Sequence, residues 1–278
     1  MTTFTDNPST TLVIGGHGKT GRRVAERLER LGPSVRHGSR SAAIPFDWAA
    51  PHTWAPALAG VTSVYLTYSP DLAAPGSCEA VTGLVALAKA AGVSRIVLLS
   101  GRGEQEAERA EDVVKASGLE WTVVRAAWFN QNFSEGSFAD DVASGTVALP
   151  VGDVLEPFVD ADDIADVAVA ALTDDRHVSE LYEVTGPRLL TFADAVAALA
   201  REMGRDLRFV SVPMFQYAET LAQYQVPREV VDLLGYLFTT VLDGRNSSVA
   251  DGVQRALGRA PRDFTDFARD YAYAAATR

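Results

Sequence analysis

The chain has 278 residues, of which 47% are hydrophobic and 22% charged, and its formal net charge is −11. This composition is typical of a soluble globular enzyme, and the acidic balance argues against nucleic acid or an anionic membrane as a main partner. The single cysteine, Cys78, excludes an intrachain disulfide and a cysteine-based zinc site.

No apolar run approaches the length of a membrane span, and the first ten residues lack the basic and apolar regions of a signal peptide. We therefore expect a short flexible leader over residues 1–10 and a cytoplasmic chain, either a monomer or a homodimer, whose partner is a small-molecule substrate.

Short apolar runs alternate with helical stretches over the first half of the chain. The runs are apolar throughout, as in strands that are covered on both faces of a parallel sheet. Strand–helix–strand alternation with short links predicts right-handed crossovers. The expected strands lie at 11–15, 34–39, 61–68, 95–100 and 121–126, and the expected helices at about 18–31, 78–92 and 103–118.

The second half has a different rhythm. It contains a turn and helix over 158–172, a strand over 181–186, a helix over 191–204 with Thr191 as its N-cap, and largely helical sequence from residue 213 onward. The predicted fold class is α/β, a Rossmann-type doubly wound parallel sheet with a smaller, mainly helical C-terminal substrate lobe. The sheet domain would span 11–150 with additions from the 155–190 region, and the lobe 151–278.

Four glycines follow the first predicted strand, and their spacing is that of a dinucleotide-binding loop. In such a loop, glycines permit a tight turn, the approach of a pyrophosphate to the backbone and close packing of helix on strand. The following amphipathic helix, with Val24, Leu28 and Leu31 on its apolar face, would offer free N–H groups to the phosphates. The four residues are Gly15, Gly16, Gly18 and Gly21.

The end of the second predicted strand favours NADP(H) over NAD(H). An NAD site places an acidic residue there to bind the ribose 2′-hydroxyl, but no acid occurs between Glu29 and Asp47. Ser39 and Arg40 stand in that place, and an arginine offers two donors to a 2′-phosphate. The sequence therefore predicts NADP(H) as the cofactor, with Lys19 as a second positive charge.

Six segments spread along nearly the whole chain carry a family resemblance. They are GGHGKTG (15–21), SVYLTYSP (63–70), RIVLLSGRG (95–103), ASGLEWTVVRAAWFNQNF (116–133), PFVDADDIADVAVAAL (157–172) and VADGVQRALGRAPRDFTDFARDYA (249–272). Together they resemble the NmrA-like branch of the atypical short-chain dehydrogenases/reductases. The last segment is similar to that of its ergot-alkaloid-type reductases and their bacterial relatives.

The resemblance implies a Rossmann domain that binds NADP(H) across the strand ends, with a substrate cleft roofed by the smaller lobe. It implies that the pyrophosphate is held by Gly15, Gly18, Lys19, Thr20 and Gly21. Carried over by position, it further implies Arg40 at the 2′-phosphate, Asp47 near the adenine, Thr67, Tyr68 and Ser69 along the path of the ribose and nicotinamide, and Ser100 with 127–130 beside the nicotinamide.

One departure concerns the proton donor. Ordinary short-chain dehydrogenases carry Tyr-x-x-x-Lys on the helix after the fifth strand, where the tyrosine protonates the carbonyl oxygen. Here that helix contains no tyrosine, and Lys115 lies near its end. Many NmrA-like members also lack the pair. The remaining catalytic candidates are Tyr68 and a hydroxyl relay through Ser100, although Tyr68 would equally pack on the ribose and Ser100 would equally cap the next helix.

Aromatic and amide side chains of the second half suit a flat substrate. An iminium, enone or quinone would accept a hydride without the usual dyad, because its own electron sink drives the transfer. The predicted substrate-binding residues are Trp128, Phe129, Asn130, Asn132 and Phe158. The acidic run at 160–166 is explained by a helix start, so no metal is expected.

Three functions stay open at this point. The first is an NADPH-dependent reductase of a small aromatic or polycyclic metabolite, possible in secondary metabolism, with an iminium, enone, quinone or ketone as the electrophile. The second is a non-catalytic NADP(H)-sensing regulatory protein. The third is a redox-neutral isomerase that keeps the cofactor fold. The aromatic-rich second half favours the reductase over the sensor.

Overall fold

The computed structural model describes residues 9–136 and 138–277, so most of the predicted leader lies outside the described residues. The chain forms two compact units. Unit 1 takes in the described residues up to Ser100 together with Gln105–Arg125 and Ile164–Tyr182. Unit 2 takes in Gly101–Glu104, Ala126–Asp163 and the described residues from Glu183 onward.

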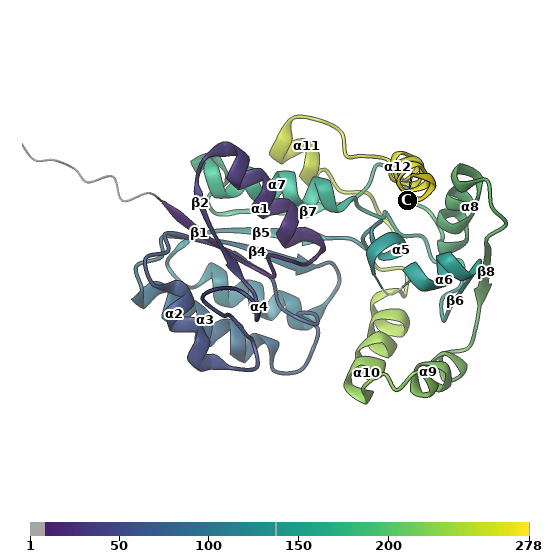
Figure 1. Cartoon of the computed structure of the whole chain (residues 1–278), viewed down its shortest axis with the longest axis horizontal. Helices are drawn as coiled ribbons and strands as arrows, with labels where there is room; N and C mark the ends of the chain where they lie inside the picture. The colour runs from purple at the N-terminus through teal and green to yellow at the C-terminus, as the bar shows by residue number, and fades with distance from the viewer. Residues whose placement is uncertain (1–8, 137, 278) are drawn as a thin grey trace, which may run out of the picture. The chain divides into compact units, whose positions relative to one another are not determined.

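A six-stranded sheet forms the centre of unit 1, in the order β2-β1-β3-β4-β5-β7 (Figure 1). The pairs β1–β2, β1–β3 and β3–β4 are parallel. From β1 the chain moves first to β2 on one side and then to β3 on the other, and such a switch point is where doubly wound folds bind ligands. The strands are β1 Thr10–Ile14, β2 Ser34–Gly38, β3 Ser63–Leu66, β4 Arg95–Gly101, β5 Glu120–Ala126 and β7 Glu180–Val184.

Helices cover both faces of this sheet, with α1 and α7 on one side and α2, α3 and α4 on the other (Figure 1). Consecutive residues of β1 are therefore buried: Leu12 and Val13 are both 0% exposed. The doubly wound α/β fold predicted from the apolar runs is confirmed. The helices are α1 Lys19–Leu31, α2 Trp54–Leu58, α3 Ser77–Ala90, α4 Gln105–Lys115 and α7 Ala161–Thr173, with 3-10 turns at Pro51–Thr53 and Asp175–His177.

Helix α1 begins after Gly18 and ends at Gly32, whose φ of 102° closes the last turn. Val24 and Leu28 face the sheet, as predicted, but Leu31 is 63% exposed, so its placement on the apolar face was wrong. Leu31 is the last residue of α1, where the helix ends at Gly32.

Unit 2 is mainly helical and also contains a small parallel sheet of β6 and β8, which the sequence analysis did not predict. Its helices α8 and α12 lie side by side (Figure 1). Thr191 caps α8 in a capping box with Asp194, as predicted. The elements are α5 Asn132–Glu135, α6 Ala139–Ser144, β6 Thr146–Leu149, α8 Phe192–Met203, β8 Arg208–Ser211, α9 Met214–Gln223, α10 Arg228–Tyr236, a π-helical turn Leu237–Val241, α11 Gly252–Leu257 and α12 Phe264–Ala276.

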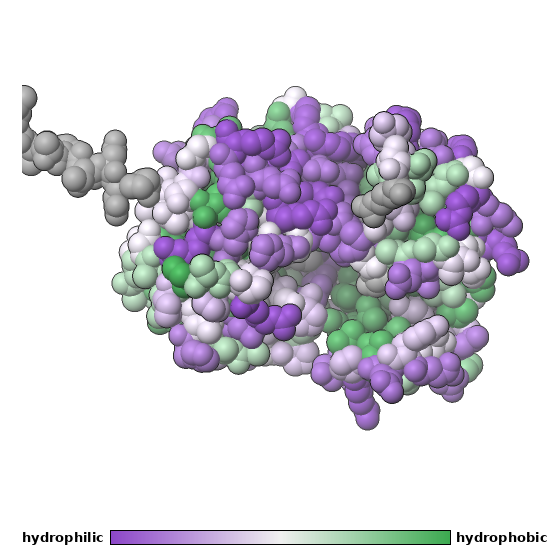
Figure 2. Space-filling view, viewed as in Figure 1, coloured by the Kyte–Doolittle hydropathy of each residue, from purple (hydrophilic) through white to green (hydrophobic). Residues whose placement is uncertain are grey.

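An aromatic cluster fills the core of unit 2. The rings of Phe133, Phe158, Phe192 and Phe264 are each at most 2% exposed and contact one another edge to face or tilted. In the space-filling view the surface over α1 is hydrophilic, whereas apolar residues gather beside α10 (Figure 2). Among the described residues, no helix is both long enough and apolar enough to span a membrane.

The packing of α1 on β1 predicts the cost of a side chain at Gly21. A Cβ built there would lie 2.1 Å from the Gly15 carbonyl oxygen, so Gly21→Ala must push the helix away from the loop. We expect a loss of about 1–3 kcal/mol in the free energy of unfolding, measured by denaturant titration. Gly152→Ala is the control, since a Cβ there meets no atom within 4 Å. Equal stability of the two variants would contradict the close packing.

Candidate functional site

The glycine loop lies between β1 and α1, at the edge of the sheet where the parallel strands end. Gly15 has a φ of 68°, in the left-handed region that favours glycine. Its N–H donates to the Gly38 carbonyl (2.9 Å), and its own carbonyl accepts from the Gly18 N–H (2.7 Å). The loop therefore turns sharply and leaves the first N–H groups of α1 without intrahelical partners, which is the local geometry that binds a phosphate.

Side chains from neighbouring elements close around this loop. Thr67 Oγ1 donates to the Ile14 carbonyl (3.1 Å) and would lie 2.7 Å from a Cβ at Gly15. The imidazole of His37 lies over Gly16, 2.8 Å from the Cβ position. Thr20 is buried, and Lys19 begins α1. A Cβ at each of these glycines would meet protein atoms, so the tight turn requires glycine, and the N-terminus of α1 that it leaves open fits a pyrophosphate.

The residues predicted to determine the preference for NADP(H) over NAD(H) lie at the end of β2. Ser39 is half-buried, and its backbone carbonyl accepts from the Phe46 N–H (2.9 Å). Arg40 is exposed and makes no hydrogen bond or ion pair with any residue that the structure describes. Asp47 Oδ1 accepts from the Ala49 N–H (3.0 Å), so its carboxylate already stabilises the local turn.

The segment after β3 carries three further predicted residues. Thr67 contacts the glycine loop, as described above, and Ser69 is exposed and precedes a cis proline. The ring of Tyr68 lies 4.8 Å from that of Trp48, centroid to centroid. Burial and then the negative charge of Glu79 raise the pKa of the Tyr68 phenol, which is therefore protonated at neutral pH.

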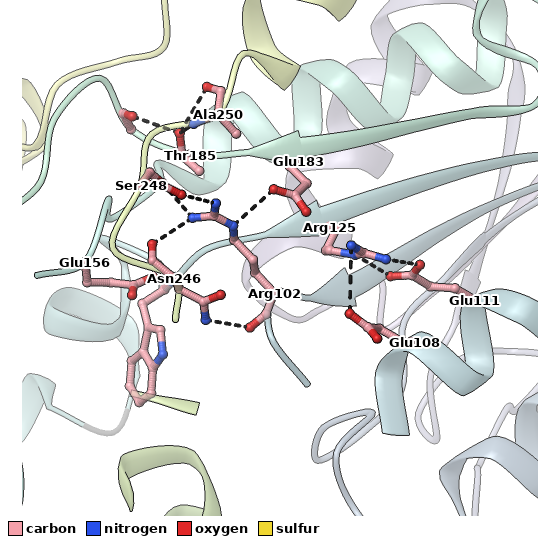
Figure 3. A network of polar contacts seen from close by, with 12 residues as sticks. Arg102, Glu108, Glu111, Arg125, Glu156, Glu183, Thr185, Asn246, Ser248 and Ala250 are labelled. Carbon is pink, nitrogen blue, oxygen red and sulfur yellow. Dashed lines mark hydrogen bonds and ion pairs between the residues drawn. The ribbon is translucent and has the colours of Figure 1, made fainter. Parts of the chain in front are cut away.

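Ser100, near the end of β4, belongs to a buried charge network in unit 1. Its Oγ donates to Glu111 Oε1 (2.8 Å), and Glu111 on α4 is 0% exposed. Arg125 from β5 donates to both carboxylate oxygens (2.8 and 2.6 Å; Figure 3). Lys115 Nζ donates to Oε2 (3.0 Å). Although burial raises it, these hydrogen bonds hold the pKa of Glu111 below its ordinary value. The Ser100 proton is thus directed at an ionised carboxylate.

Three of the predicted substrate-binding residues lie in one segment of unit 2. Trp128 is half-buried, and its ring centroid lies 5.3 Å from that of Phe238. Phe129 pairs with Val159 in an isolated bridge. Asn130 is 0% exposed, and its Nδ2 donates to Asp160 (3.4 Å) while its Oδ1 has no partner among the described residues.

The other two predicted residues of unit 2 take structural positions in this structure. Phe158 is 2% exposed and packs into the aromatic core, 4.9 Å from Phe192 between ring centroids. The backbone of Asn132, at the start of α5, donates to the Phe129 carbonyl (3.1 Å) and accepts from the Phe138 N–H (3.1 Å).

The sequence analysis did not single out Glu156, which lies close to Trp128. Its side chain is 1% exposed, Oε1 accepts from the Trp128 N–H (3.3 Å), and Oε2 has no partner within the described chain. Burial raises its pKa to about 7, and the Trp128 N–H and the charge of Arg102 only partly oppose this. Arg102 directs its guanidinium elsewhere, at Glu183, the Asn246 carbonyl and Ser248 (Figure 3).

The doubly wound sheet and the glycine cradle at α1 define a dinucleotide-binding protein. No group of three or more metal-ligating side chains occurs in residues 9–136 and 138–277. A family model described as NAD(P)H-binding matches residues 15–175, and the chain belongs to this family. It is thus a member of an NAD(P)H-dependent oxidoreductase family, whose relatives include proteins named as an NAD(P)H azoreductase and an agroclavine dehydrogenase.

Curated relatives align over almost the full chain. The prestalk A differentiation protein A of Dictyostelium discoideum is 28% identical, covering 97% of this chain and 95% of its own. The NAD(P)H azoreductase of Xenophilus azovorans is 30% identical, covering 95% and 98%. The agroclavine dehydrogenase of Claviceps fusiformis is also 30% identical, covering 94% and 96%.

Solved structures share the fold. A nucleoside-diphosphate-sugar epimerase from Staphylococcus aureus superposes with a TM-score of 0.80 at 17% identity, covering 94% of this chain and 99% of that one. NmrA, a negative transcriptional regulator solved with NAD, has a TM-score of 0.73 at 15% identity, and 97% of each chain is covered. The predicted resemblance to NmrA-like proteins and to clavine-type reductases is thereby confirmed.

The raised pKa of Glu156 predicts a pH-dependent stability difference between the wild type and Glu156→Gln. An unfolded glutamate ionises near pH 4.5, whereas folded Glu156 keeps its proton up to about pH 7. As the pH rises from 4.5 to about 7, the free energy of unfolding of the wild type therefore falls relative to that of the amide variant. We expect the difference to shift by about 2–4 kcal/mol in favour of Glu156→Gln between pH 4 and pH 8. Denaturant titrations across this range would measure it, and a constant difference would show that the carboxyl is already ionised.

Proposed function

We propose that the protein is an NADPH-dependent reductase that transfers a hydride to a small aromatic or polycyclic metabolite. In this proposal it is an atypical short-chain dehydrogenase/reductase, with unit 1 binding the cofactor and unit 2 supplying substrate contacts. The observation that carries it is the glycine cradle, in which Gly15, Gly18 and Gly21 leave the N-terminus of α1 open to a pyrophosphate.

The names of two relatives support hydride transfer as the activity of this protein. One is named as an azoreductase and the other as an agroclavine dehydrogenase. Bound NADPH would supply the hydride, while the protein orients the electrophile and excludes water. The half-buried ring of Trp128 offers a flat surface for such a molecule.

The cofactor preference rests on Arg40. Its exposed guanidinium has no partner within the described residues, so a 2′-phosphate would gain contacts without breaking any. Because no acidic residue occurs between Glu29 and Asp47, the usual partner of an NAD ribose is missing at this strand end.

The catalytic roles of Tyr68 and Ser100 differ in this proposal. Tyr68 keeps its phenolic proton at neutral pH because its pKa is raised, so it can donate a hydrogen bond. The hydroxyl group of Ser100 donates a hydrogen bond to Glu111 (2.8 Å), so its oxygen lone pairs are left to accept a hydrogen bond from a ligand. Helix α4, which carries Tyr-x-x-x-Lys in ordinary short-chain dehydrogenases, has no tyrosine here.

Replacing Arg40 tests the cofactor preference. Arg40→Ala should weaken NADPH binding by about 1.5–3 kcal/mol, the scale of a lost charge-assisted hydrogen bond, and leave NADH binding almost unchanged. Isothermal titration of both cofactors would measure this. Arg109→Ala is the matched control, because it removes an exposed positive charge from α4 of the same unit, where Arg109 pairs with Glu106. Equal losses for NADPH and NADH in Arg40→Ala would refute a role at the 2′-phosphate.

The reductase itself is tested by binding and turnover together. We expect purified protein to bind NADPH more tightly than NADH and to oxidise it in the presence of a quinone, an enone or a cyclic imine. Tight binding without turnover on any of these classes would favour an NADP(H) sensor or a redox-neutral isomerase. Absence of NADPH binding would contradict the cofactor site.

A further inference from the structure

Glu156 differs from Glu111 and Asp163, two carboxylates of the described chain that are 0% exposed. Glu111 is neutralised by Arg125 and Lys115, and buried Asp163 is paired with Arg259 and Arg262. Glu156 is equally buried, at 1% exposed, but no cation donates to it. Since burying an unpaired carboxylate is costly, this side chain is stable there as the neutral acid.

The backbone holds Glu156 in this environment. Its N–H donates to the Leu190 carbonyl (2.9 Å), and the Leu190 N–H donates back to its carbonyl (3.0 Å). Glu156 and Leu190 thus form an isolated antiparallel β-bridge, and Pro157 follows Glu156 in the chain. The charged group that acts on its carboxyl is Arg102, which is already hydrogen-bonded to Glu183, Asn246 and Ser248 (Figure 3).

A neutral carboxyl group has one O–H that requires an acceptor. Oε1 already accepts from the Trp128 N–H, and Oε2 has no partner in the described part of the chain. Buried polar atoms without partners are uncommon and call for a ligand or an ordered water. The unsatisfied atom belongs to the carboxyl group that accepts from the backbone N–H of Trp128, the residue whose ring is predicted to bind the substrate.

We propose that Glu156 is the proton donor of the reduction, with its Oε2–H contacting the heteroatom of a substrate bound against Trp128. The inference rests on the proposed function. It narrows the substrate class to neutral electrophiles in which the double bond that is reduced contains oxygen or nitrogen, or is conjugated to it, such as a quinone or a carbonyl compound. It also supplies the group that the missing tyrosine of α4 provides in ordinary short-chain dehydrogenases.

The proposed step balances in atoms and electrons. Bound NADPH would supply a hydride to the electrophilic atom of the substrate and become NADP⁺, and the displaced π-electron pair would move to the heteroatom. That atom would take the proton of Glu156, whose O–H bond breaks and leaves a carboxylate. The substrate would thus be reduced by two electrons, and the carboxylate would regain a proton from water.

The test compares the pH dependence of quinone reduction in three variants with the wild type. Wild-type kcat/KM should fall as the pH rises through about 7, because the donor is then ionised. Glu156→Gln should lower kcat by about 10²–10⁴-fold and remove this alkaline limb, with NADPH affinity unchanged. Glu156→Asp should keep the limb with a smaller loss. Asp141→Asn, which removes another acid of raised pKa in unit 2, should match the wild type.

Two results would overturn the assignment. One is a Glu156→Gln variant that retains the wild-type alkaline limb. The other is a Tyr68→Phe variant that loses the limb while Glu156→Gln keeps it, which would make Tyr68 the donor. The stability profile described above establishes that Glu156→Gln is folded.

An infrared difference spectrum separates failure of this inference from failure of the proposed function. In wild type minus Glu156→Gln, the protonated carboxyl band should shift when a quinone is added. If no electrophile is turned over, the proposed reductase function fails. In that case a shifted band still supports the contact between Glu156 and the ligand, and an unshifted band refutes it.

Discussion

The contact between Gly21 and the Gly15 carbonyl is the constraint on which the rest of unit 1 depends. It sets how closely α1 approaches β1, and this distance fixes where the first N–H groups of the helix point. The same turn brings Gly15 against Thr67, so the ends of β1 and β3 are coupled through one loop. A binding geometry for phosphate thus follows from the absence of two side chains rather than from the presence of any charged group.

Three buried acids of the described chain follow two opposite arrangements. Glu111 is paired with Arg125 and Lys115, and Asp163 with Arg259 and Arg262, and these ion pairs fix the elements that they join. Glu156 receives one backbone N–H and retains a proton. The electrostatic difference comes from where the nearby arginine points: Arg102 holds the 246–248 segment rather than the carboxyl beside it. These buried carboxyl groups are therefore distinguished by their partners and not by their depth.

The sequence predicted the sheet and the glycine loop well because both depend on local patterns. Apolar strand runs and the glycine spacing are read over a few residues, and the Thr191 cap is a local signal too. The β6–β8 pair was missed because each strand has four residues and their partners lie about sixty positions apart. The exposure of Leu31, the last residue of α1, depends on its tertiary surroundings, and helical periodicity does not predict these. Glu111 could have been found, since Ala107, Ala110 and Val114 mark the buried face of α4. Glu156 has no such periodic signal.

The two units are interleaved along the chain, and this has a consequence for synthesis on the ribosome. Strand β7 pairs with β5 at the edge of the sheet, but it begins only at Glu180. The unit 2 segment Ala126–Asp163 lies between the two strands in the sequence. Until that strand emerges, β5 forms an open edge with unpaired backbone N–H and C=O groups, of the kind that recruits other chains. The sheet of a nascent chain therefore lacks its edge strand β7 while the ribosome synthesises the intervening unit 2 residues. The chain is vulnerable to aggregation during this interval, before its last strand arrives.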